Sequence, residues 1–436
     1  MPEKRQFAKP TPQQLEWAEQ ELGVLIHYVM DIYNPTMNDK IKTKEVRTAM
    51  PASIFAPEGW DVDQWIRSAK EAGAKYAILV ANHCTGFSLW PTKTDDYSVA
   101  SCAYKNGQGD IVREFIDACK KYDLKPGLYY STACSGYYGI NDAYRQDYKS
   151  PEYQAYVRVV EQQVTEIWSQ YGELFELWFD GGNIPVSEGG PHTPDLVRKY
   201  QPNAVCFQGP EGHPHNLRWV GNENGLASGD CFSTITLGAS RPELEYGEDR
   251  RLLASGDPFG NCWLPAETDM PNREACAYGG GWGWAENEQD KVYSAEHLLD
   301  RYINSVGHNS NLLIGMAIAK NGRFEDEQQF IDFGKLIEQT FGDGAKLAEA
   351  KGTSAPVQTV TLDEAKPISY VVIREDITEG HRVLGFRVLI DGEEIFAARC
   401  IGHKRIVKVD GKVGKTVTVE ITESRDTPVL RDVAVY

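Results

Sequence analysis

The sequence predicts an α/β fold, a (β/α)8 barrel of the TIM type, followed by a C-terminal antiparallel β-sandwich. From residue 22 to about residue 318, short apolar and β-branched runs alternate with amphipathic stretches, a pattern typical of βα units around a parallel sheet. Eight of these apolar runs have the length of a strand. Beyond residue 344 the apolar residues recur at every second position with Asp-Gly turns between them, which indicates antiparallel strands.

The eight predicted strands of the barrel are 22–29, 75–83, 125–131, 174–181, 204–209, 217–223, 262–268 and 311–318. Helical spacing of apolar residues predicts helices over 61–73, 110–123, 150–172 and 295–307, and a last helix within 323–344. Proline and glycine gather in 182–194 and 225–260, which indicates long loops after the fourth and sixth strands. In this fold such loops build the active face.

The length of the chain is consistent with two domains. Its 436 residues exceed what one hydrophobic core usually supports, but they suit a barrel with a small accessory domain. Period-two segments at 368–377, 382–400 and 416–424 supply the strands of that second domain. We expect a catalytic barrel over residues 1–345 and a β-sandwich over residues 346–436.

Charge and composition limit the classes of partner. A net charge of -18 and a pI near 5.0 argue against a nucleic-acid partner, which requires a basic surface. Neither a signal-peptide core nor a run of about 18 apolar residues is present in the sequence, so we expect a soluble chain with no membrane span. The compartment stays open: the cytoplasm, or the periplasm or exterior if a signal peptide was removed. Nine cysteines without CxxC pairs are expected to be mostly buried thiols.

Several predicted strands end on polar or ionisable residues. His27, His83, Asp180 and Glu223 each follow an apolar run. The carboxyl ends of barrel strands converge on one pocket, and a carboxylate placed there without a purpose would carry a desolvation cost. The sequence therefore predicts an active site at this end of the barrel.

Glycoside hydrolysis uses a pair of carboxylates, and this sequence places two on different predicted strands. Asp180 lies at the end of the predicted strand in ELWFDGG, 176–182. By the period of two, Trp178 and Asp180 point to the same, inward side of the strand, and the glycines after Asp180 leave room for a substrate. Glu223 ends the sixth strand, and Arg218 in the same strand could lower the pKa of a nearby carboxylate or orient the sugar. One carboxylate would attack the anomeric carbon while the other protonates the leaving oxygen. The alternatives are a loop-capping role for Asp180 and a structural ion pair between Arg218 and Glu223.

A metal site is the weaker interpretation. His213 and His215 lie close in sequence with His192 upstream, but zinc prefers histidines on a firm element with a third ligand. The sequence lacks a Walker motif, a dinucleotide glycine motif and a GxSxG elbow, so phosphate and α/β-hydrolase chemistry lack support. We expect neither a cofactor nor a metal.

Six segments of the barrel together resemble the α-L-fucosidases of glycoside hydrolase family 29. They are GVLIHY at 23–28, 72–99, 110–131, ELWFDGG at 176–182, RWVGNE at 218–223 and PAETD at 265–269. The segments 370–392 and 401–406 resemble the β-sandwich of that family's narrower-specificity branch. The resemblance runs through the whole chain, and it implies a retaining exo-glycosidase that binds a fucosylated glycan.

The resemblance implies Asp180 as nucleophile and Glu223 as general acid/base, with Glu267 as the rival for the second role. Other residues are implied in substrate binding: His27 and His83 on sugar hydroxyls, Tyr130 lining the pocket, Trp178 and Glu267 nearby, Arg218 orienting the acid/base or substrate, and Trp284 as an aromatic wall. Core packing remains the alternative for each of them.

Two departures from the family pattern leave the sugar open. The family usually has His-His-Asp-Gly-Phe where this chain has His83-Cys84-Thr85-Gly86-Phe87, so a thiol replaces one imidazole. The family's Glu-Trp pair is missing from 31–51. L-galactose is L-fucose with a hydroxyl on C6, and apolar pockets reject an added hydroxyl only by about 10²-fold. An α-L-galactosidase is therefore the main alternative, and a catalytically silent glycan-binding protein is a further one.

Overall fold

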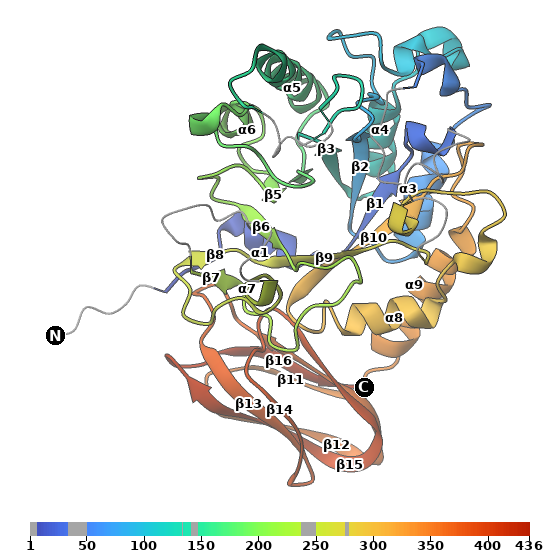
Figure 1. Ribbon diagram of the computed structural model, residues 1–436. Coiled ribbons are helices and arrows are strands. Elements are labelled where there is room, and N and C mark those ends of the chain that lie inside the picture. Colours follow the sequence, from blue (N-terminus) through green and yellow to red (C-terminus); the bar gives the residue numbers. More distant parts are fainter. Residues whose placement is uncertain (1–6, 34–49, 133, 141–146, 237–249, 275–278) are drawn as a thin grey trace.

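A closed barrel of parallel strands forms the larger part of the protein (Figure 1). The computed structural model describes residues 7–33, 50–132, 134–140, 147–236, 250–274 and 279–436. Around the barrel the strands follow the order β1-β10-β9-β6-β5-β4-β3-β2. Their bounds are β1 Leu22–His27, β2 Tyr76–Asn82, β3 Lys125–Tyr130, β4 Glu176–Trp178, β5 Val205–Phe207, β6 Asn216–Trp219, β9 Ala266–Met270 and β10 Ser310–Ala317. The predicted fold class is confirmed.

Helices flank the barrel on its outer side (Figure 1). The described helices are α1 Pro12–Ala18, α3 Val62–Glu71, α4 Ile111–Tyr122, α5 Pro151–Gln170, α6 Thr193–Tyr200, α7 Arg250–Ser255, α8 Ala295–Ile303 and α9 Glu327–Phe341. Five of them begin at a side-chain cap that accepts a backbone N–H of the first turn: α1 at Thr11, and four helices that the sequence predicts at Asp61, Asp110, Ser150 and Ser294. These caps explain why the helices start where the sequence predicts.

The seventh predicted strand is two strands in the structure. Only β9 belongs to the barrel, whereas β8, Cys262–Trp263, pairs antiparallel with β7, Thr234–Ile235. Pro265 separates β8 from β9, and a proline has no N–H to donate to a strand ladder. The long loop after β6 therefore carries a small sheet of its own.

Helix α1 covers the amino-terminal end of the barrel. Trp17 packs against Val205 and Leu217, and its indole donates a hydrogen bond of 3.1 Å to Glu176 at the start of β4. The opposite end of the barrel, where the strands finish, is the end that carries the candidate site.

The C-terminal residues form an antiparallel β-sandwich with its own core. Its six strands, in the order β11-β16-β12-β15-β13-β14, are β11 Ala348–Thr353, β12 Val357–Glu375, β13 Val383–Ile390, β14 Glu393–Ala398, β15 Arg405–Ser424 and β16 Leu430–Val435. Buried Val371, Ile373, Val407 and Val419 belong to this core. Asp391 and Gly392 both have positive φ in the turn between β13 and β14, as the tight Asp-Gly hairpin turn requires.

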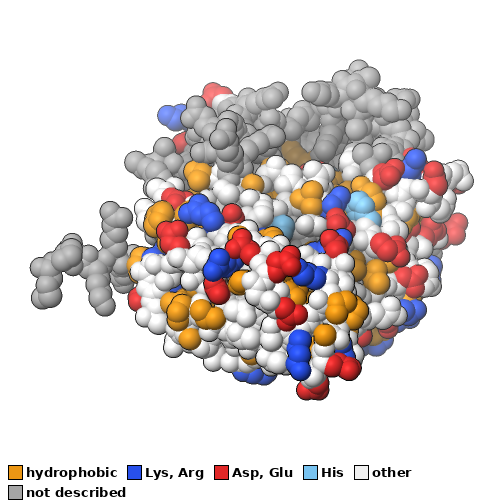
Figure 2. All heavy atoms as spheres, turned by 90° about the horizontal axis from the view of Figure 1, so that it is seen from below, with side chains coloured by type: hydrophobic (Ala, Val, Ile, Leu, Met, Phe, Trp, Pro, Cys, Tyr) orange, Lys and Arg blue, Asp and Glu red, His pale blue; other side chains and the backbone are white. Residues whose placement is uncertain are grey.

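The sandwich contacts the barrel beside the amino-terminal ends of two strands. Lys404 pairs with Glu21, just before β1, and the backbone of His403 donates to Asn309, just before β10, at 2.7 Å. Viewed from the sandwich side, acidic and basic side chains intermix over the surface (Figure 2). Among the described residues, no helix combines the length and apolar character needed to cross a bilayer.

Candidate active site

The carboxyl ends of β1, β2 and β4 bring predicted site residues together. The rings of His27 and His83 lie 6.1 Å apart, and ligand atoms of His83 and Asp180 lie within 4.8 Å of each other. The Trp282 ring lies 5.1 Å from His27, and its indole N–H donates to Glu223 at 3.1 Å. The structure therefore brings four of the predicted residues together at the carboxyl end of the barrel, with Trp282 as a link between His27 and Glu223.

Asp180 is held at the end of β4 by its neighbours. The Tyr129 hydroxyl donates a hydrogen bond of 2.8 Å to Oδ2 of Asp180. Phe179 turns outward to pack against Trp168 of α5, as the alternation of strand side chains predicts. Gly181 and Gly182 follow with φ of 73° and 77°, a conformation that favours glycine. The chain can therefore turn sharply beside the carboxylate and leave it partly exposed.

His27 and His83 bring imidazole groups with different surroundings to the site. Burial and the charge of nearby His83 lower the pKa of His27 to about 3, so His27 is neutral near pH 7. His83 stacks on Tyr129 with ring centroids 5.8 Å apart, and Asp31 lies 3.7 Å from its Nδ1. A neutral imidazole can both donate to and accept from a hydroxyl group.

The aromatic residue beside His27 is Trp282, and the prediction of Trp284 is corrected. The Trp284 indole donates to Glu325 at 2.9 Å, and its ring is buried against Ala317 and Ala319. Both tryptophans occur in the segment Gly-Trp-Gly-Trp, 281–284. The sequence predicts no strand directly before this segment, so strand alternation cannot tell which ring faces the site. The sequence signal pointed to the segment, but it could not choose between the two rings.

Tyr130 faces away from the pocket, contrary to prediction. Its hydroxyl donates to Gln163 of α5 at 2.7 Å, whereas the preceding Tyr129 contacts Asp180. Successive side chains of a barrel strand alternate between the interior and the surrounding helices. Tyr129 is thus a site residue that the sequence analysis missed by one position.

Arg218 anchors loops, contrary to the role predicted for it. The guanidinium is fully buried and donates to the backbone carbonyls of Leu253, Leu264 and Phe232. The adjacent Trp219 points inward instead, and its indole donates to Asp269 at 2.7 Å. Arg218 therefore fixes the segments after β6 and before β9.

Glu267 lies inside the barrel beneath the pocket. It is fully buried and accepts hydrogen bonds from the Tyr76 hydroxyl at 2.8 Å and the Trp178 indole at 3.0 Å. Trp178 itself is sandwiched between Phe207 and Tyr129, at 4.1 and 5.3 Å between ring centroids. Glu267 and Trp178 therefore support the floor of the site, whereas both were predicted to bind the substrate.

Asp269 is a second residue that the sequence analysis missed. It lies two positions beyond Glu267 on β9 and so shares its inward face. Burial raises the pKa of Asp269 well above its usual value, as does the repulsion from Glu223, Glu267 and Asp180. Period two along PAETD was the signal that could have found it.

Glu176 and Glu267 form a buried carboxyl pair in the barrel interior, which makes stability depend on pH. Burial raises the pKa of Glu267 from 4.5 to about 7, and burial together with Glu267 raises that of Glu176 well above 4.5. At pH values above 4.5 the folded protein therefore binds more protons than the unfolded chain. The contribution of this pair to the free energy of unfolding is greatest below pH 4.5 and is lost as the pH rises through 7.

Glu176→Gln is expected to reduce this pH dependence, because the amide carries no charge and can donate to Glu267. Between pH 5 and 8 the wild-type free energy of unfolding should fall by about 2 kcal/mol more than that of the variant. Urea unfolding at several pH values measures the difference, with the exposed Glu173→Gln as control. Equal pH profiles for Glu176→Gln and wild type would contradict the prediction.

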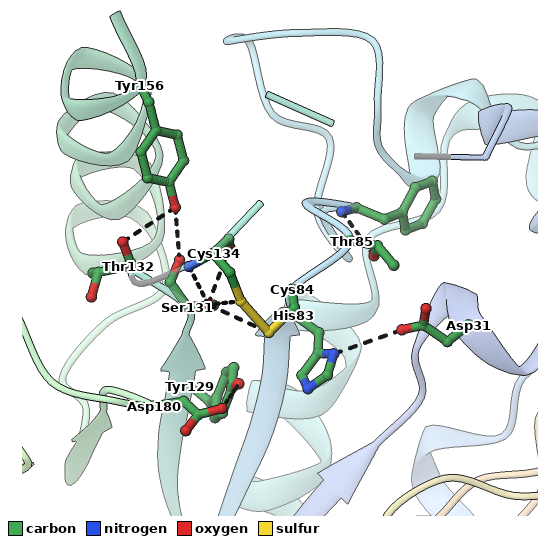
Figure 3. The surroundings of a disulfide bond; sticks show 11 residues. Asp31, His83, Cys84, Thr85, Tyr129, Ser131, Thr132, Cys134, Tyr156 and Asp180 are labelled. Carbon is green, nitrogen blue, oxygen red and sulfur yellow. Dashed lines mark hydrogen bonds and ion pairs between the residues drawn. A yellow bond between two sulfur atoms is a disulfide. The ribbon is translucent and has the colours of Figure 1, made fainter. Parts of the chain in front are cut away.

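A disulfide joins Cys84 and Cys134 beside the pocket (Figure 3). Most of the described cysteines are buried thiols, as predicted, and this disulfide is the exception that the sequence did not predict. The free cysteines are Cys102, Cys119, Cys206, Cys231, Cys262 and Cys400, and of these Cys262 is only partly buried. Cys276, and all but the ends of the segment 31–51 that lacks the family's Glu-Trp pair, lie outside the described residues. The disulfide links the loops that follow β2 and β3, directly after His83.

His213 and His215 are engaged in structural hydrogen bonds. His213 lies 2.9 Å from the carbonyl oxygen of Ala204, and His215 lies 2.9 Å from the hydroxyl of Thr11. His192 is exposed at the start of α6. Among the described residues, the cluster with metal-ligand character is instead His83, Cys84 and Asp180.

Comparisons with known proteins all find similarity to alpha-L-fucosidases or to glycoside hydrolase family 29. A family model described as alpha-L-fucosidase matches residues 6–332. Alpha-L-fucosidase 1 of Arabidopsis thaliana is 28% identical over 475 residues, which cover 98% of this chain and 87% of the plant protein. The crystal structure of a candidate alpha-L-fucosidase from Bacteroides thetaiotaomicron is 29% identical, with a TM-score of 0.88 over 99% of both chains. That of a glycoside hydrolase 29 family member from a rumen bacterium is 28% identical, with a TM-score of 0.82 over 99% of this chain and 77% of the other.

Proposed function

Because this chain belongs to the alpha-L-fucosidase family of glycoside hydrolases, we propose that it is an exo-acting, retaining enzyme that releases terminal α-L-fucose from oligo- or polysaccharides. The observation that carries the proposal is the placement of Asp180 at the barrel mouth, oriented by Tyr129 and next to two glycines. A fixed and accessible carboxylate at this position is suited to attack a sugar carbon.

The proposed reaction has two steps. In the first, Asp180 attacks C1 of the sugar from the face opposite the leaving group, and Glu223 gives a proton to the departing oxygen. In the second, Glu223 takes a proton from water, whose oxygen attacks C1 and releases Asp180. Each displacement inverts C1, so the product keeps the original configuration. Trp282 supports this role for Glu223, because its N–H holds one carboxylate oxygen.

Sugar recognition is assigned to the groups around Asp180. The neutral His27, together with His83, would contact ring hydroxyls, and the Trp282 ring would pack against an apolar face of the sugar. His83 adjoins the nucleophile, and His27 adjoins Trp282.

α-L-Galactosidase activity is the second candidate, and Cys84 is the observation that favours it. A half-cystine in the Cys84–Cys134 disulfide stands where the family usually has an imidazole. A disulfide sulfur has no proton to donate, so one contact that would otherwise select the sugar is changed. An extra hydroxyl on C6 is a small difference for such a pocket to exclude.

The test compares release of p-nitrophenol from the α-L-fucoside and the α-L-galactoside by the wild-type enzyme. A higher kcat/KM on the fucoside supports the proposal, and the reverse supports the second candidate. Proton NMR of the first product identifies the mechanism, since a retaining enzyme releases the α anomer before mutarotation. No hydrolysis of either glycoside or of fucosylated glycans would favour a glycan-binding role.

Tyr129→Phe is expected to lower kcat/KM by roughly 10-fold or more, because a hydrogen bond to a charged group contributes about 1.5–3 kcal/mol. The control is Tyr130→Phe, which removes a hydroxyl of the same kind on the opposite side of the same strand. That variant should lose stability, because Gln163 loses a buried partner, but should keep kcat/KM at temperatures where it is folded. Equal kinetic losses in both variants would contradict the assignment of Tyr129.

A further inference from the structure

The Cys84–Cys134 disulfide stands beside two other potential metal ligands. One nitrogen of His83, the sulfur of Cys84 and a carboxylate oxygen of Asp180 all lie within 4.8 Å of one another. The Cα atoms of the two cysteines are 4.9 Å apart, so both sulfurs reach the same corner of the pocket. Nitrogen, sulfur and carboxylate oxygen are the donor types that zinc prefers.

Asp31 gives His83 the environment of a metal-binding histidine. Its buried carboxylate lies 3.7 Å from Nδ1 of His83, and the other ring nitrogen points to the side of Tyr129 and Asp180 (Figure 3). Histidines that bind zinc usually turn their second nitrogen toward a carboxylate or carbonyl, which fixes the ring and its tautomer. This second observation is independent of the distances among the three donors.

We propose that reduction of the Cys84–Cys134 disulfide turns this corner of the pocket into a binding site for a thiophilic divalent ion such as Zn²⁺. His83, Cys84 and Asp180 are the first three ligands, and the released Cys134 sulfur is the fourth. Donors of a tetrahedral zinc ion lie about 3.4–3.8 Å apart. The donors therefore need to approach one another by about 1 Å, a movement that opening of the disulfide permits.

The chemistry balances with a dithiol as reductant. The S–S bond takes up two electrons and two protons and becomes two thiols, while the dithiol closes into its own disulfide. Zn²⁺ then displaces the thiol protons and binds the thiolates. While the disulfide is closed, neither sulfur is a thiolate, so the oxidised enzyme is expected to bind zinc weakly at this site.

The consequence for catalysis rests on the proposed function. A zinc ion on Asp180 would occupy the carboxylate that has to attack C1, so the reduced, zinc-loaded enzyme should be inactive. Binding of the ion does not depend on that role, and zinc stoichiometry therefore tests the site separately from hydrolysis.

The experiment compares two variants that both lack the disulfide. Cys134→Ser keeps the His83, Cys84 and Asp180 donors, whereas the double variant Cys84→Ser/Cys134→Ser removes both sulfurs from the site. Each is titrated with Zn²⁺ against a chromophoric chelator, without reductant, beside the oxidised wild type. Co²⁺ in place of Zn²⁺ adds a spectroscopic reading, because thiolate coordination gives a charge-transfer absorption. Thermal unfolding of both variants establishes that they are folded.

Cys134→Ser is expected to bind one zinc ion at least about tenfold more tightly than Cys84→Ser/Cys134→Ser, and it alone should show the thiolate–cobalt absorption. Adding Asp31→Asn to Cys134→Ser should weaken binding by roughly 10- to 100-fold. Zinc should also inhibit hydrolysis by Cys134→Ser but not by Cys84→Ser/Cys134→Ser. Equal zinc affinity in these two variants would overturn the site. Tight binding without inhibition would leave the site in place but contradict the role of Asp180.

Discussion

Replacing Asp180 with alanine is expected to lower kcat on an aryl α-L-fucoside by at least about 10⁴-fold, because the first displacement loses its nucleophile. Asp180→Asn should lose nearly as much, although its amide oxygen can still accept the hydrogen bond from Tyr129. The pair of variants thereby separates the charge of the side chain from its shape. Initial rates give the loss, and the melting temperature shows whether the barrel is intact.

Azide provides the positive control for the Asp180→Ala prediction. The space left by the side chain admits a small anion, which can attack C1 from the face that Asp180 uses. The product is then the β-glycosyl azide, because only one inverting displacement takes place. An Asp180→Ala enzyme with wild-type kcat would contradict the assignment of the nucleophile.

Glu223→Ala has the second largest expected effect, and its size depends on the leaving group. On natural glycans, whose leaving oxygen needs a proton, kcat/KM should fall by about 10²- to 10⁴-fold. On aryl glycosides with a good leaving group the first step should be little affected, and the glycosyl-enzyme should accumulate. Azide, which needs no general base, should restore turnover and give the α-glycosyl azide.

Asp269 is the alternative to Glu223 as the general acid/base. It lies at the mouth of the barrel with a raised pKa, so it also could serve as a proton donor. Asp269→Asn keeps an oxygen that can accept the Trp219 hydrogen bond. If Asp269→Asn shows the leaving-group pattern and Glu223→Ala does not, the acid/base is Asp269. Glu267 is less suited to the role, because Tyr76 and Trp178 enclose it beneath the pocket.

The barrel was predictable because its signal is repeated. All eight strands lie on or beside the apolar runs that predict them, and caps such as Asp61 and Asp110 mark the helix starts. The division of the run 262–268 was not predicted. Cys262–Trp263 is as apolar as a barrel strand, and only its pairing with Thr234–Ile235 reveals that it belongs to another sheet.

The site was predictable where one residue follows one strand, as for Asp180 and His27. It was not predictable where it depends on the side of a strand on which a side chain lies, or on contacts between segments far apart in sequence. Tyr129 and Tyr130 are adjacent residues of one type, and their choice depends on the register of β3 in the closed barrel. The pairing of Cys84 with Cys134 depends on the path of two loops that are 50 residues apart in sequence. Arg218 was predicted to act on a carboxylate or the substrate, but it donates to backbone carbonyls. The sequence does not reveal which carbonyls lie near a buried guanidinium.

The pairing of β1 with β10 has a consequence for the order in which the protein folds. Leu22 lies beside Leu312, so the barrel cannot close until the ribosome has delivered nearly three quarters of the chain. Until then the edges of β1 and β9 stay open to other strands, and contacts of such long sequence separation form slowly. Newly made chains are therefore most exposed to aggregation just before β10 emerges, which makes this the stage at which a chaperone would have the greatest effect on yield.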